Sequence, residues 1–351
     1  MELNLDFFRH LPKAELHCHL DGSPRPETIL ELAAEQGVEL PAKDADELKA
    51  LITIGDRVGS LEDYIDHFQL PLRVLQTPEA LERVAYELAE DAWNDGVHYM
   101  EVRYSPILHT RSGMTGAESI EAVKRGLDQA DDDLGIRTGI IICGIRNISP
   151  DISLRLADLA VQFKHKGVVG FDLAGAEENF PAKHHQEAFF LILKNNINTT
   201  LHAGEAFGPE SIHQAIHYCG AHRIGHGTRL LEDQDLMHYV NDHRIALEVC
   251  LTSNVHTKTV RSLKEHPFKY YYDQGIRVTL NTDNRLVSNT TLSREYLKAK
   301  ETFGLTLTDF RDIIINGFKA SFLSHQERRE IIKRVVDELE AEFGIKPLII
   351  A

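Results

Sequence analysis

Apolar stretches with the length of β-strands alternate with amphipathic, helix-like stretches along most of the chain, and this alternation restricts the fold more than any other feature. Several strand-like stretches are continuous apolar runs, such as the one at 140–143, which is typical of parallel strands covered by helices. The predicted strands are 14–21, 97–105, 136–144, 168–173, 198–203, 222–226, 245–251 and 276–282. Eight β/α units predict a TIM (β/α)8 barrel, although an open, doubly wound sheet gives a similar alternation.

Predicted helices separate these strands and continue after the last of them. They are 26–36, 78–95, 115–134, 151–165, 184–195, 209–218, 232–241 and 264–274, followed by helices beyond Leu292. The capping pair Ser60 and Asp63 predicts one more helix, whose apolar stripe consists of Leu61, Tyr64, Ile65 and Phe68. No linker or low-complexity tract interrupts the pattern, so we expect residues 1–351 to form a single (β/α)8-barrel domain with additional helices.

The charge balance excludes several classes of partner. The sequence has 38 Lys and Arg residues against 54 Asp and Glu residues, and the formal net charge of −16 repels nucleic acids and anionic membranes. The four cysteines are scattered without a C-x-x-C pair, and the sequence has neither a signal peptide nor a transmembrane-length apolar run. We therefore expect a cytoplasmic protein that binds neither nucleic acid nor membrane, and the sequence predicts no particular oligomeric state.

Two histidines in the first predicted strand form the strongest local motif. In Glu-Leu-His-Cys-His-Leu-Asp, the two-residue period of a strand places His17 and His19 on one face and Cys18 on the other. Two imidazoles on one face can bind the same divalent metal ion, but a lone H-x-H pair is more often a pair of hydrogen-bonded histidines. A metal site therefore requires further ligands from other strands.

Polar residues at the ends of other predicted strands provide such ligands. The fifth strand ends in Leu-His202-Ala-Gly-Glu205, the sixth in Ile-Gly-His226-Gly, and the eighth in Asn-Thr-Asp283-Asn284. In a TIM barrel the carboxyl ends of the strands meet at one face, where catalytic residues lie. Each motif alone is explained by a turn histidine or a helix-capping aspartate. Together with the histidine pair of the first strand, the motifs indicate a metal site.

The residue types at this site indicate metal-assisted hydrolysis. Imidazole nitrogens with one carboxylate suit zinc, although iron, cobalt or manganese could occupy such a site. Zinc lowers the pKa of a bound water towards ~7, which makes hydroxide available near neutral pH. Glu205 is placed to move a proton between that water and a substrate, and His226 is placed to hold or deprotonate the water. The sequence thus predicts one Zn²⁺ per chain.

Five ordered motifs resemble a known family. They are His-Cys-His-Leu-Asp-Gly, Asp-Leu-Ala-Gly175, His-Ala-Gly-Glu205, Gly-His226-Gly and Asn-Thr-Asp283. On these motifs the sequence resembles the adenosine deaminase family, from about Leu11 to the final helices. The resemblance implies hydrolytic deamination of adenosine and 2′-deoxyadenosine to inosine and deoxyinosine, with release of ammonia, in purine salvage.

The resemblance also implies a role for each residue at a matching position. Zinc would be held by His17, His19, His202 and Asp283. Glu205 would protonate purine N1 while hydroxide attacks C6, and His226 would steer the hydroxide. Gly175 would donate its backbone N–H to purine N3, and Asp21 would bind the ribose 5′-hydroxyl. A hydrophobic gate over the pocket would consist of Leu61, Tyr64, Ile65 and Phe68.

Two positions depart from the commoner family pattern. Asn284 stands where many members have a second aspartate, and Ala176 stands where many have an acid. Purine N7 accepts a hydrogen bond, so the amide of Asn284 can donate to N7 at any pH, whereas an aspartate would first need a proton. A carboxylate at Asp21 suits a neutral 5′-hydroxyl and would repel a 5′-phosphate, which disfavours AMP as the substrate.

Other functions fit parts of the pattern. A related purine deaminase acting on adenine or aminodeoxyfutalosine would share the zinc chemistry, and Asp21 favours the nucleoside over these. A catalytically silent binding relative is disfavoured because the ligand set and the proton shuttle are complete. An unrelated amide or ester hydrolase on the same barrel is a further alternative. Zinc deaminases with H-x-E and P-C-x-x-C motifs are excluded because the chain lacks a C-x-x-C sequence.

Overall fold

Eight parallel strands follow one another around a barrel in the computed structural model, which describes residues 3–54 and 61–345. The strands are β1 (Lys13–His19), β2 (Val97–Tyr104), β3 (Arg137–Ile145), β4 (Val168–Ala174), β5 (Asn198–Ala203), β6 (Arg223–His226), β7 (Ala246–Val249) and β8 (Val278–Leu280). Each strand pairs in parallel with the next one along the chain. This order confirms the predicted TIM barrel and excludes the open, doubly wound sheet.

The first and last strands meet where two of the predicted metal ligands lie. Cys18 forms a parallel bridge with Asp283, just beyond β8. The backbone N–H of His19 donates to the carbonyl of Asp283 at 2.7 Å, and the N–H of Asp283 donates to the carbonyl of His17 at 2.9 Å. Helix α15 (Leu307–Ala320) packs against both β1 and β8. Closure of the barrel therefore fixes Asp283 beside the histidine pair.

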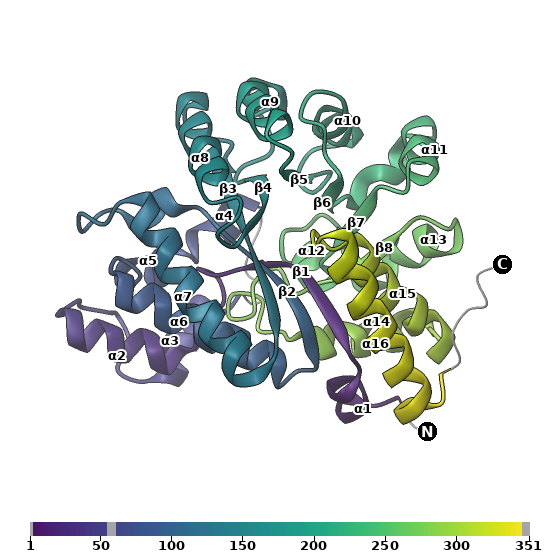
Figure 1. Cartoon of the computed structure of the whole chain (residues 1–351), viewed down its shortest axis with the longest axis horizontal. Helices are drawn as coiled ribbons and strands as arrows, with labels where there is room; N and C mark the ends of the chain where they lie inside the picture. The colour runs from purple at the N-terminus through teal and green to yellow at the C-terminus, as the bar shows by residue number, and fades with distance from the viewer. Residues whose placement is uncertain (1–2, 55–60, 346–351) are drawn as a thin grey trace.

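Helices surround the strands and form the connections between them (Figure 1). Besides α15, the α-helices are α1 (Leu5–His10), α2 (Pro26–Gln36), α3 (Ala45–Ile52), α4 (Leu61–Asp66), α5 (Gln69–Val74), α6 (Pro78–Trp93), α7 (Gly116–Leu134), α8 (Pro150–Gln162), α9 (Gln186–Lys194), α10 (Pro209–His217), α11 (Gln234–Asp242), α12 (Leu251–His256), α13 (Phe268–Asp273), α14 (Leu292–Phe303) and α16 (His325–Phe343). The 3₁₀ helices are η1 (Pro106–His109), η2 (Ala182–His185), η3 (Thr228–Glu232) and η4 (Leu263–Glu265). Capping boxes begin α7, α15 and α16.

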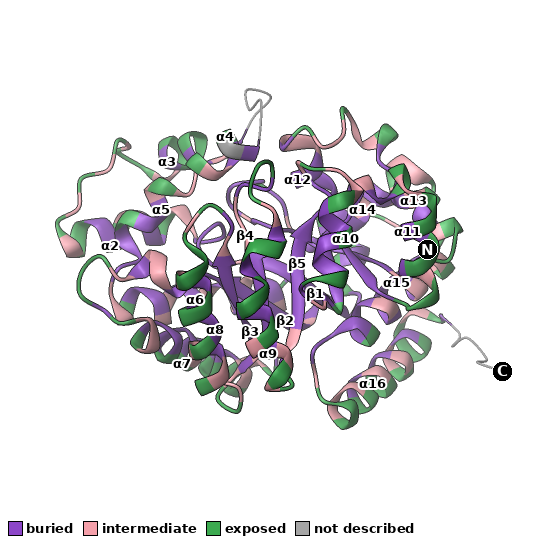
Figure 2. Ribbon diagram, turned by 90° about the horizontal axis from the view of Figure 1, so that it is seen from above, coloured by how far each residue is buried: buried purple, intermediate pink, exposed green. Residues whose placement is uncertain are grey.

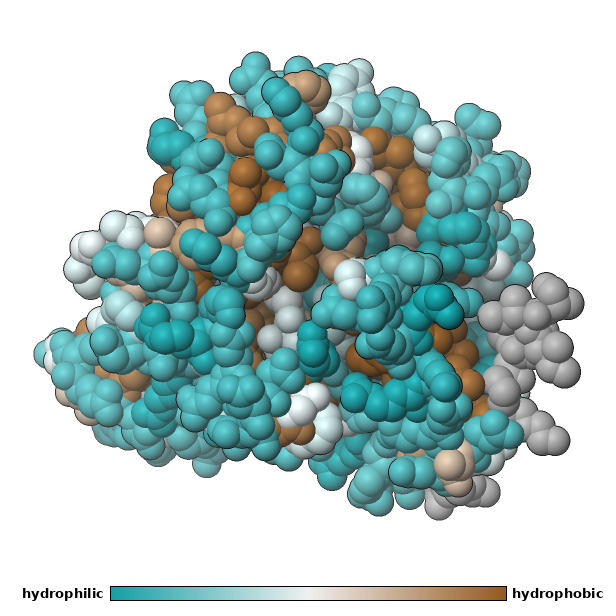
Figure 3. Space-filling view, in the orientation of Figure 1, coloured by the Kyte–Doolittle hydropathy of each residue, from teal (hydrophilic) through white to brown (hydrophobic). Residues whose placement is uncertain are grey.

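The strands are buried between the barrel interior and the ring of helices. Figure 2 shows buried residues along the strands and exposed residues on the outward faces of the helices. The outer surface in Figure 3 is mostly hydrophilic, and its hydrophobic residues form separate small patches. Among the described residues, no helix combines the length and the apolar character needed to cross a membrane.

Some helices differ from the sequence-based prediction. Helices α1, α3, α5 and α12 were not predicted, and α12 begins at Leu251, where the predicted strand 245–251 overran β7 by two residues. The predicted helix 264–274 is divided into η4 and α13, and Pro267, which has no N–H to donate, lies directly before α13. The predicted cap Ser60 lies outside the described residues, and α4 is described from Leu61.

Candidate active site

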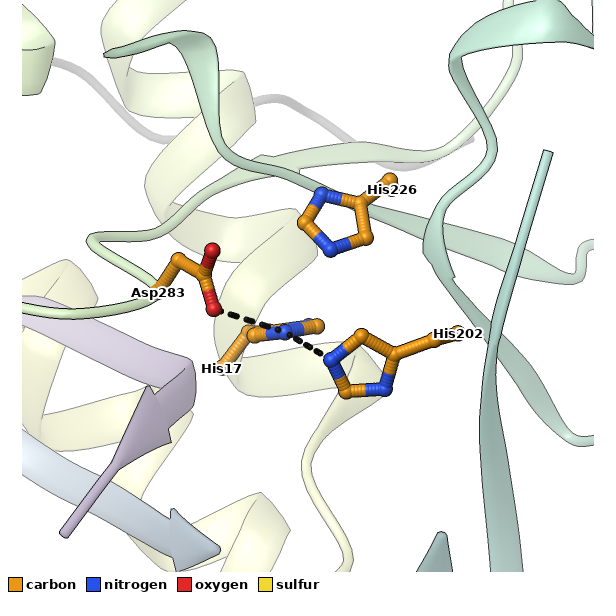
Figure 4. A group of neighbouring side chains, drawn as sticks. All are labelled: His17, His202, His226 and Asp283. Carbon is orange, nitrogen blue, oxygen red and sulfur yellow. Dashed lines mark hydrogen bonds and ion pairs between the residues drawn. The ribbon is translucent and has the colours of Figure 1, made fainter. Parts of the chain in front are cut away.

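Four side chains from different strands converge at the carboxyl-end face of the barrel. His17 lies in β1, His202 lies in β5, His226 ends β6, and Asp283 follows β8. One ligand atom from each of these residues lies within 4.8 Å of the others, and all four residues are buried. Figure 4 shows the four side chains pointing towards a common centre.

His19 contributes a fifth group to the same centre. Its Nε2 lies 3.1 Å from Nε2 of His202 and 3.4 Å from Oδ1 of Asp283. The corresponding distances from Nε2 of His17 are 3.0 Å and 3.4 Å. Ligand atoms about 2.0–2.1 Å from a tetrahedral metal ion are separated by about 3.3 Å. The donor set formed by His17, His19, His202 and Asp283 therefore fits a small divalent cation.

Two buried carboxylates orient the histidines towards this centre. The Nδ1–H of His17 donates to Oε2 of Glu248 at 2.8 Å, and the Nδ1–H of His202 donates to Oδ1 of Asp172 at 3.2 Å. Arg103 donates to both carboxylates, at 2.8 and 2.9 Å. A hydrogen-bonded Nδ1–H leaves the Nε2 lone pair free for a metal ion. The outer partners thus set the tautomer that a metal ligand requires.

Two arginines keep the carboxylate of Glu248 ionised. Burial opposes the ionisation of Glu248, but Arg103 and Arg223 hold its pKa well below the ordinary value. Arg223 donates from Nε to Oε1 of Glu248 at 2.6 Å. Because Glu248 has two cationic partners besides His17, its charge stays paired when a single partner is removed.

His226 has the opposite tautomer. The amide nitrogen of Asn254 donates to Nδ1 of His226 at 3.0 Å. The amide oxygen of Asn254 accepts from Thr228 Oγ1 at 3.0 Å and contacts Nε2 of His266 at 3.2 Å, which fixes the orientation of the amide. With Nδ1 as an acceptor, the proton of the neutral ring lies on Nε2. Burial lowers the pKa of His226 well below its ordinary value, so the ring is neutral.

Two residues at the centre have strained backbones. His226 and Asp283 both have φ values of 63°, in the left-handed region that residues with a side chain rarely adopt. Each such residue costs of order 1–3 kcal/mol and persists where the surrounding structure holds it. Here the strained positions are those that turn an imidazole and a carboxylate into the centre at the ends of β6 and β8.

Glu205 is a buried acid beside the centre. It lies three residues after His202, and its Oε2 is 3.5 Å from Nε2 of His226. Its Oε1 is buried without a hydrogen-bond partner among residues 3–54 and 61–345. Burial, followed by the charges of Asp283 and Glu177, raises the pKa of Glu205 well above its ordinary value. A carboxyl group that keeps its proton near neutral pH can act as a general acid.

Asp21 offers a second buried carboxyl group with open hydrogen-bonding capacity. Its Oδ1 has no hydrogen-bond partner within the described part of the chain, and its Oδ2 lies 3.9 Å from Nε2 of His109. Burial raises the pKa of Asp21 to about 7. A buried polar atom without a partner is unfavourable, so this oxygen is suited to a ligand that donates a hydrogen bond.

One member of the predicted hydrophobic stripe, Tyr64, makes polar contacts. The hydroxyl of Tyr64 lies 2.9 Å from Oγ of Ser288 and accepts a hydrogen bond from the amide nitrogen of Asn284 at 2.8 Å. One N–H of Asn284 is therefore used within the protein, and its Oδ1 is buried without a hydrogen-bond partner among the described residues. Tyr64 contributes a hydroxyl to the pocket as well as apolar surface.

One pocket contains the predicted site residues other than His17, which is fully buried. Those lining it are His19, Asp21, Leu61, Tyr64, Ile65, Phe68, Gly175, His202, Glu205, His226, Asp283 and Asn284. Gly175 has a φ of 93°, a conformation that L side chains rarely adopt, and it follows directly after β4. Leu61 and Ile65 bring apolar surface from α4 to the same pocket, and Phe68, the N-cap residue of α5, adds an aromatic ring.

Several residues at the site were not predicted. Arg103, Asp172 and Glu248 are charged residues inside apolar strands, a pattern in the sequence that could have identified them. Arg111, which also lines the pocket, and Asn254 lie in segments without such a signal. Their positions become apparent only when the strands and their loops are assembled.

These parts together define a class of protein: a metal-dependent hydrolase that works at the carboxyl-end face of a TIM barrel. The comparisons with known proteins narrow the class. The sequence matches the adenosine deaminase family over residues 12–338. The chain belongs to the adenosine deaminase family.

Relatives match most of the chain. An adenosine deaminase from Mycobacterium marinum is 44% identical over 349 residues, which cover 95% of this chain and 96% of that protein. A probable adenosine deaminase from Dictyostelium discoideum is 44% identical over 339 residues and covers 95% of this chain, but the chain spans only 44% of that longer protein.

Solved structures share the fold. An adenine deaminase from Arthrobacter aurescens has a TM-score of 0.88 and 26% sequence identity, covering 94% of this chain and 100% of that one. An amidohydrolase from Burkholderia ambifaria with bound Zn has a TM-score of 0.85 and 25% identity, covering 97% and 96%.

Proposed function

We propose that this chain catalyses the hydrolytic deamination of adenosine and 2′-deoxyadenosine at one zinc ion, with residues 1–351 acting as a single catalytic domain. The observation that carries the proposal is the convergence of three imidazoles and a carboxylate beside the buried acid Glu205. Membership of the adenosine deaminase family supports the reaction. The matched region, 12–338, and the single ordered barrel support one domain.

The metal ligands proposed are His17, His19, His202 and Asp283. The tautomer distinguishes His17 and His202 from His226, because a protonated Nε2 has no lone pair for a metal ion. The nitrogen-rich donor set suits zinc, and the related Burkholderia structure contains Zn. When bound, zinc supplies Lewis-acid chemistry that lowers the pKa of a water molecule towards neutrality.

The residues of the chain supply the proton transfers. The Nε2–H of His226 donates a hydrogen bond to the attacking water and steers its oxygen towards C6 of the purine. Glu205 protonates N1 as the oxygen adds to C6, and it recovers a proton from the same water. The C6–N bond then breaks as Glu205 delivers this proton to the amino group, which leaves as ammonia, and Glu205 takes up the proton of the C6 hydroxyl group as the carbonyl forms. Inosine is the product.

The rest of the pocket holds the nucleoside in this orientation. Gly175 donates its backbone N–H to N3, and the unpartnered oxygen of Asp21 accepts from the ribose 5′-hydroxyl. The apolar gate over the purine is formed by Leu61, Tyr64, Ile65 and Phe68. The second N–H of Asn284 donates to N7.

The proposed contact of Asn284 leads to a prediction about substrate analogues. 7-Deazaadenosine has C–H in place of N7, so it would leave a buried amide N–H without a partner, at a cost of roughly 1–3 kcal/mol. We expect the native protein to prefer adenosine by that amount in kcat/KM, and Asn284→Ala to discriminate much less. Equal discrimination by both proteins would place the purine elsewhere in the pocket.

A substrate panel tests the proposed function. Adenosine, 2′-deoxyadenosine, adenine and AMP are compared by the ultraviolet change that accompanies deamination. We expect the two nucleosides to react with the highest kcat/KM, because adenine cannot use Asp21 and the phosphate of AMP would face its carboxyl group. Arg111 also lines the pocket, and a guanidinium group can bind a phosphate. AMP is therefore the critical comparison. A higher kcat/KM for AMP or adenine would replace the proposed substrate.

A further inference from the structure

Four consecutive backbone N–H groups in the loop after β5 point at one carboxylate. Gly204 donates to Oε1 of Glu177 at 2.6 Å, and Glu205, Ala206 and Phe207 donate to Oε2 at 3.0, 2.6 and 2.9 Å. The loop is neither helix nor strand, so these donors have no partners from secondary structure. A ring of N–H groups of this kind favours a negative charge at its centre.

Glu177 is buried at the position where it makes these contacts. It has 4% of its surface exposed, whereas the next residue, Glu178, is exposed. The two carboxylate oxygens can accept about four hydrogen bonds, which is the number donated by the loop. The carboxylate is therefore matched to the backbone of this loop.

The same loop is held from its other side. The backbone N–H of Arg229 in η3 donates to the carbonyl of Gly204 at 2.9 Å, and Nη1 of Arg229 donates to the carbonyl of Ala206 at 3.4 Å. The loop that carries Glu205 is thus fixed between a residue following β4 and a residue following β6. Its backbone conformation depends on contacts outside its own sequence.

Glu177 lies close to Gly175 in the chain and contacts the loop of Glu205, so it links two segments of the proposed substrate site. Glu177 lies two residues after Gly175, and it bonds to the backbone of Glu205 itself. In the proposed function, Gly175 and Glu205 contact N3 and N1, which lie along the same edge of the purine. Glu177 connects the two protein segments that contact this edge.

We infer that Glu177 is a positioning residue for the deamination, and that its carboxylate holds the backbone of Glu205 so that the carboxyl group of Glu205 reaches purine N1. The inference rests on the proposed function of Glu205. Displacing a reacting group by about 1 Å can lower a rate by ~10²-fold. A carboxamide at position 177 has a single acceptor oxygen and turns an NH₂ group towards backbone N–H donors, so it would displace the loop.

A double-mutant cycle tests this role in the zinc-loaded, full-length protein. kcat for adenosine and the metal content are measured for native protein, Glu177→Gln, Glu205→Gln and the double variant. We expect Glu177→Gln to keep one zinc and to lose about 10²-fold in kcat. The double variant should be as slow as Glu205→Gln alone, within about twofold, because a displaced acid matters only while the acid is present.

Two further variants make the result specific. Glu178→Gln removes the same charge from an exposed neighbour and should keep native kcat. Glu177→Asp keeps the charge but withdraws it by one methylene, and it is carried through the same cycle in case the amide variant does not fold. It should lose kcat in the native background and have no additional effect in the Glu205→Gln background.

Separate outcomes overturn the inference and the function on which it rests. A kcat within about twofold of native in the Glu177 variants, or an equal fold-loss in both backgrounds, would make Glu177 a purely structural residue. Near-native turnover by Glu205→Gln would instead remove the proposed role of Glu205. The inference can therefore fail while the proposed function stands.

Discussion

Replacing Glu205 by Gln is expected to lower kcat for adenosine by at least ~10²–10⁴-fold, the usual contribution of a general acid–base group. The amide nearly preserves the size of the side chain, but it has no proton to give to N1 and cannot recover one from water. Metal content should stay unchanged, because the four atoms that fit the ion belong to other residues. Steady-state kinetics and metal analysis on the same preparation measure both effects.

Glu178→Gln is the matched control for this variant. It makes the same chemical change at an exposed residue and should leave both kcat and zinc content at native values. Turnover by Glu205→Gln within a few-fold of native would assign the proton transfer to another group in the pocket.

Replacing His17 by Ala should remove the bound metal and with it the formation of inosine. Its Nε2 is fully buried at the centre and lies 3.0 Å from Nε2 of His202. The fold should survive, because Glu248 keeps Arg103 and Arg223 as partners after the imidazole is lost. Metal analysis, activity and circular dichroism of the purified variant separate loss of the ion from loss of the fold.

Cys18→Ala is the control for the strand that carries this ligand. Cys18 is adjacent in sequence and equally buried, but its Sγ faces Oγ of Ser23 at 3.5 Å. We expect this variant to keep one metal ion and most of its activity. Metal loss in Cys18→Ala, or a fully loaded His17→Ala protein, would contradict the proposed ligand set.

The barrel could be predicted because its signals are local. Apolar runs define parallel strands, and capping residues such as Thr115 and Ser324 mark where helices begin. Helix α12 could not be predicted in this way, because the apolar residues Cys250 and Leu251 continue the pattern of β7 without a turn signal. Strand ends are less sharply encoded than strand interiors.

The candidate site was predictable to the extent that its residues follow strands. The H-x-H pair and the polar strand ends bring His17, His202 and Asp283 to the same face once a barrel is assumed. The hydrogen bonds that orient them join residues distant in sequence, such as His17 and Glu248, 231 positions apart. No local pattern encodes such pairs.

Tautomers and loop anchors are also properties of the assembled fold. Asn254 determines which ring nitrogen of His226 carries the proton, and the amide of Asn254 is oriented by two further residues. Glu177 lies two residues after Gly175, and nothing in the sequence indicates that it accepts hydrogen bonds from residues 204–207. The structure was needed to distinguish the proposed metal ligands from the residue proposed to steer the water.

Zinc titration of metal-free protein tests the central proposal most directly. The protein is stripped with a chelator, zinc is added back in measured fractions of one equivalent, and the initial rate of inosine formation from adenosine is recorded at each point. We predict no turnover in the stripped protein and a linear rise in rate that reaches its plateau at one zinc per chain. Full turnover by the stripped protein, or a rate that does not respond to zinc, would contradict the proposal.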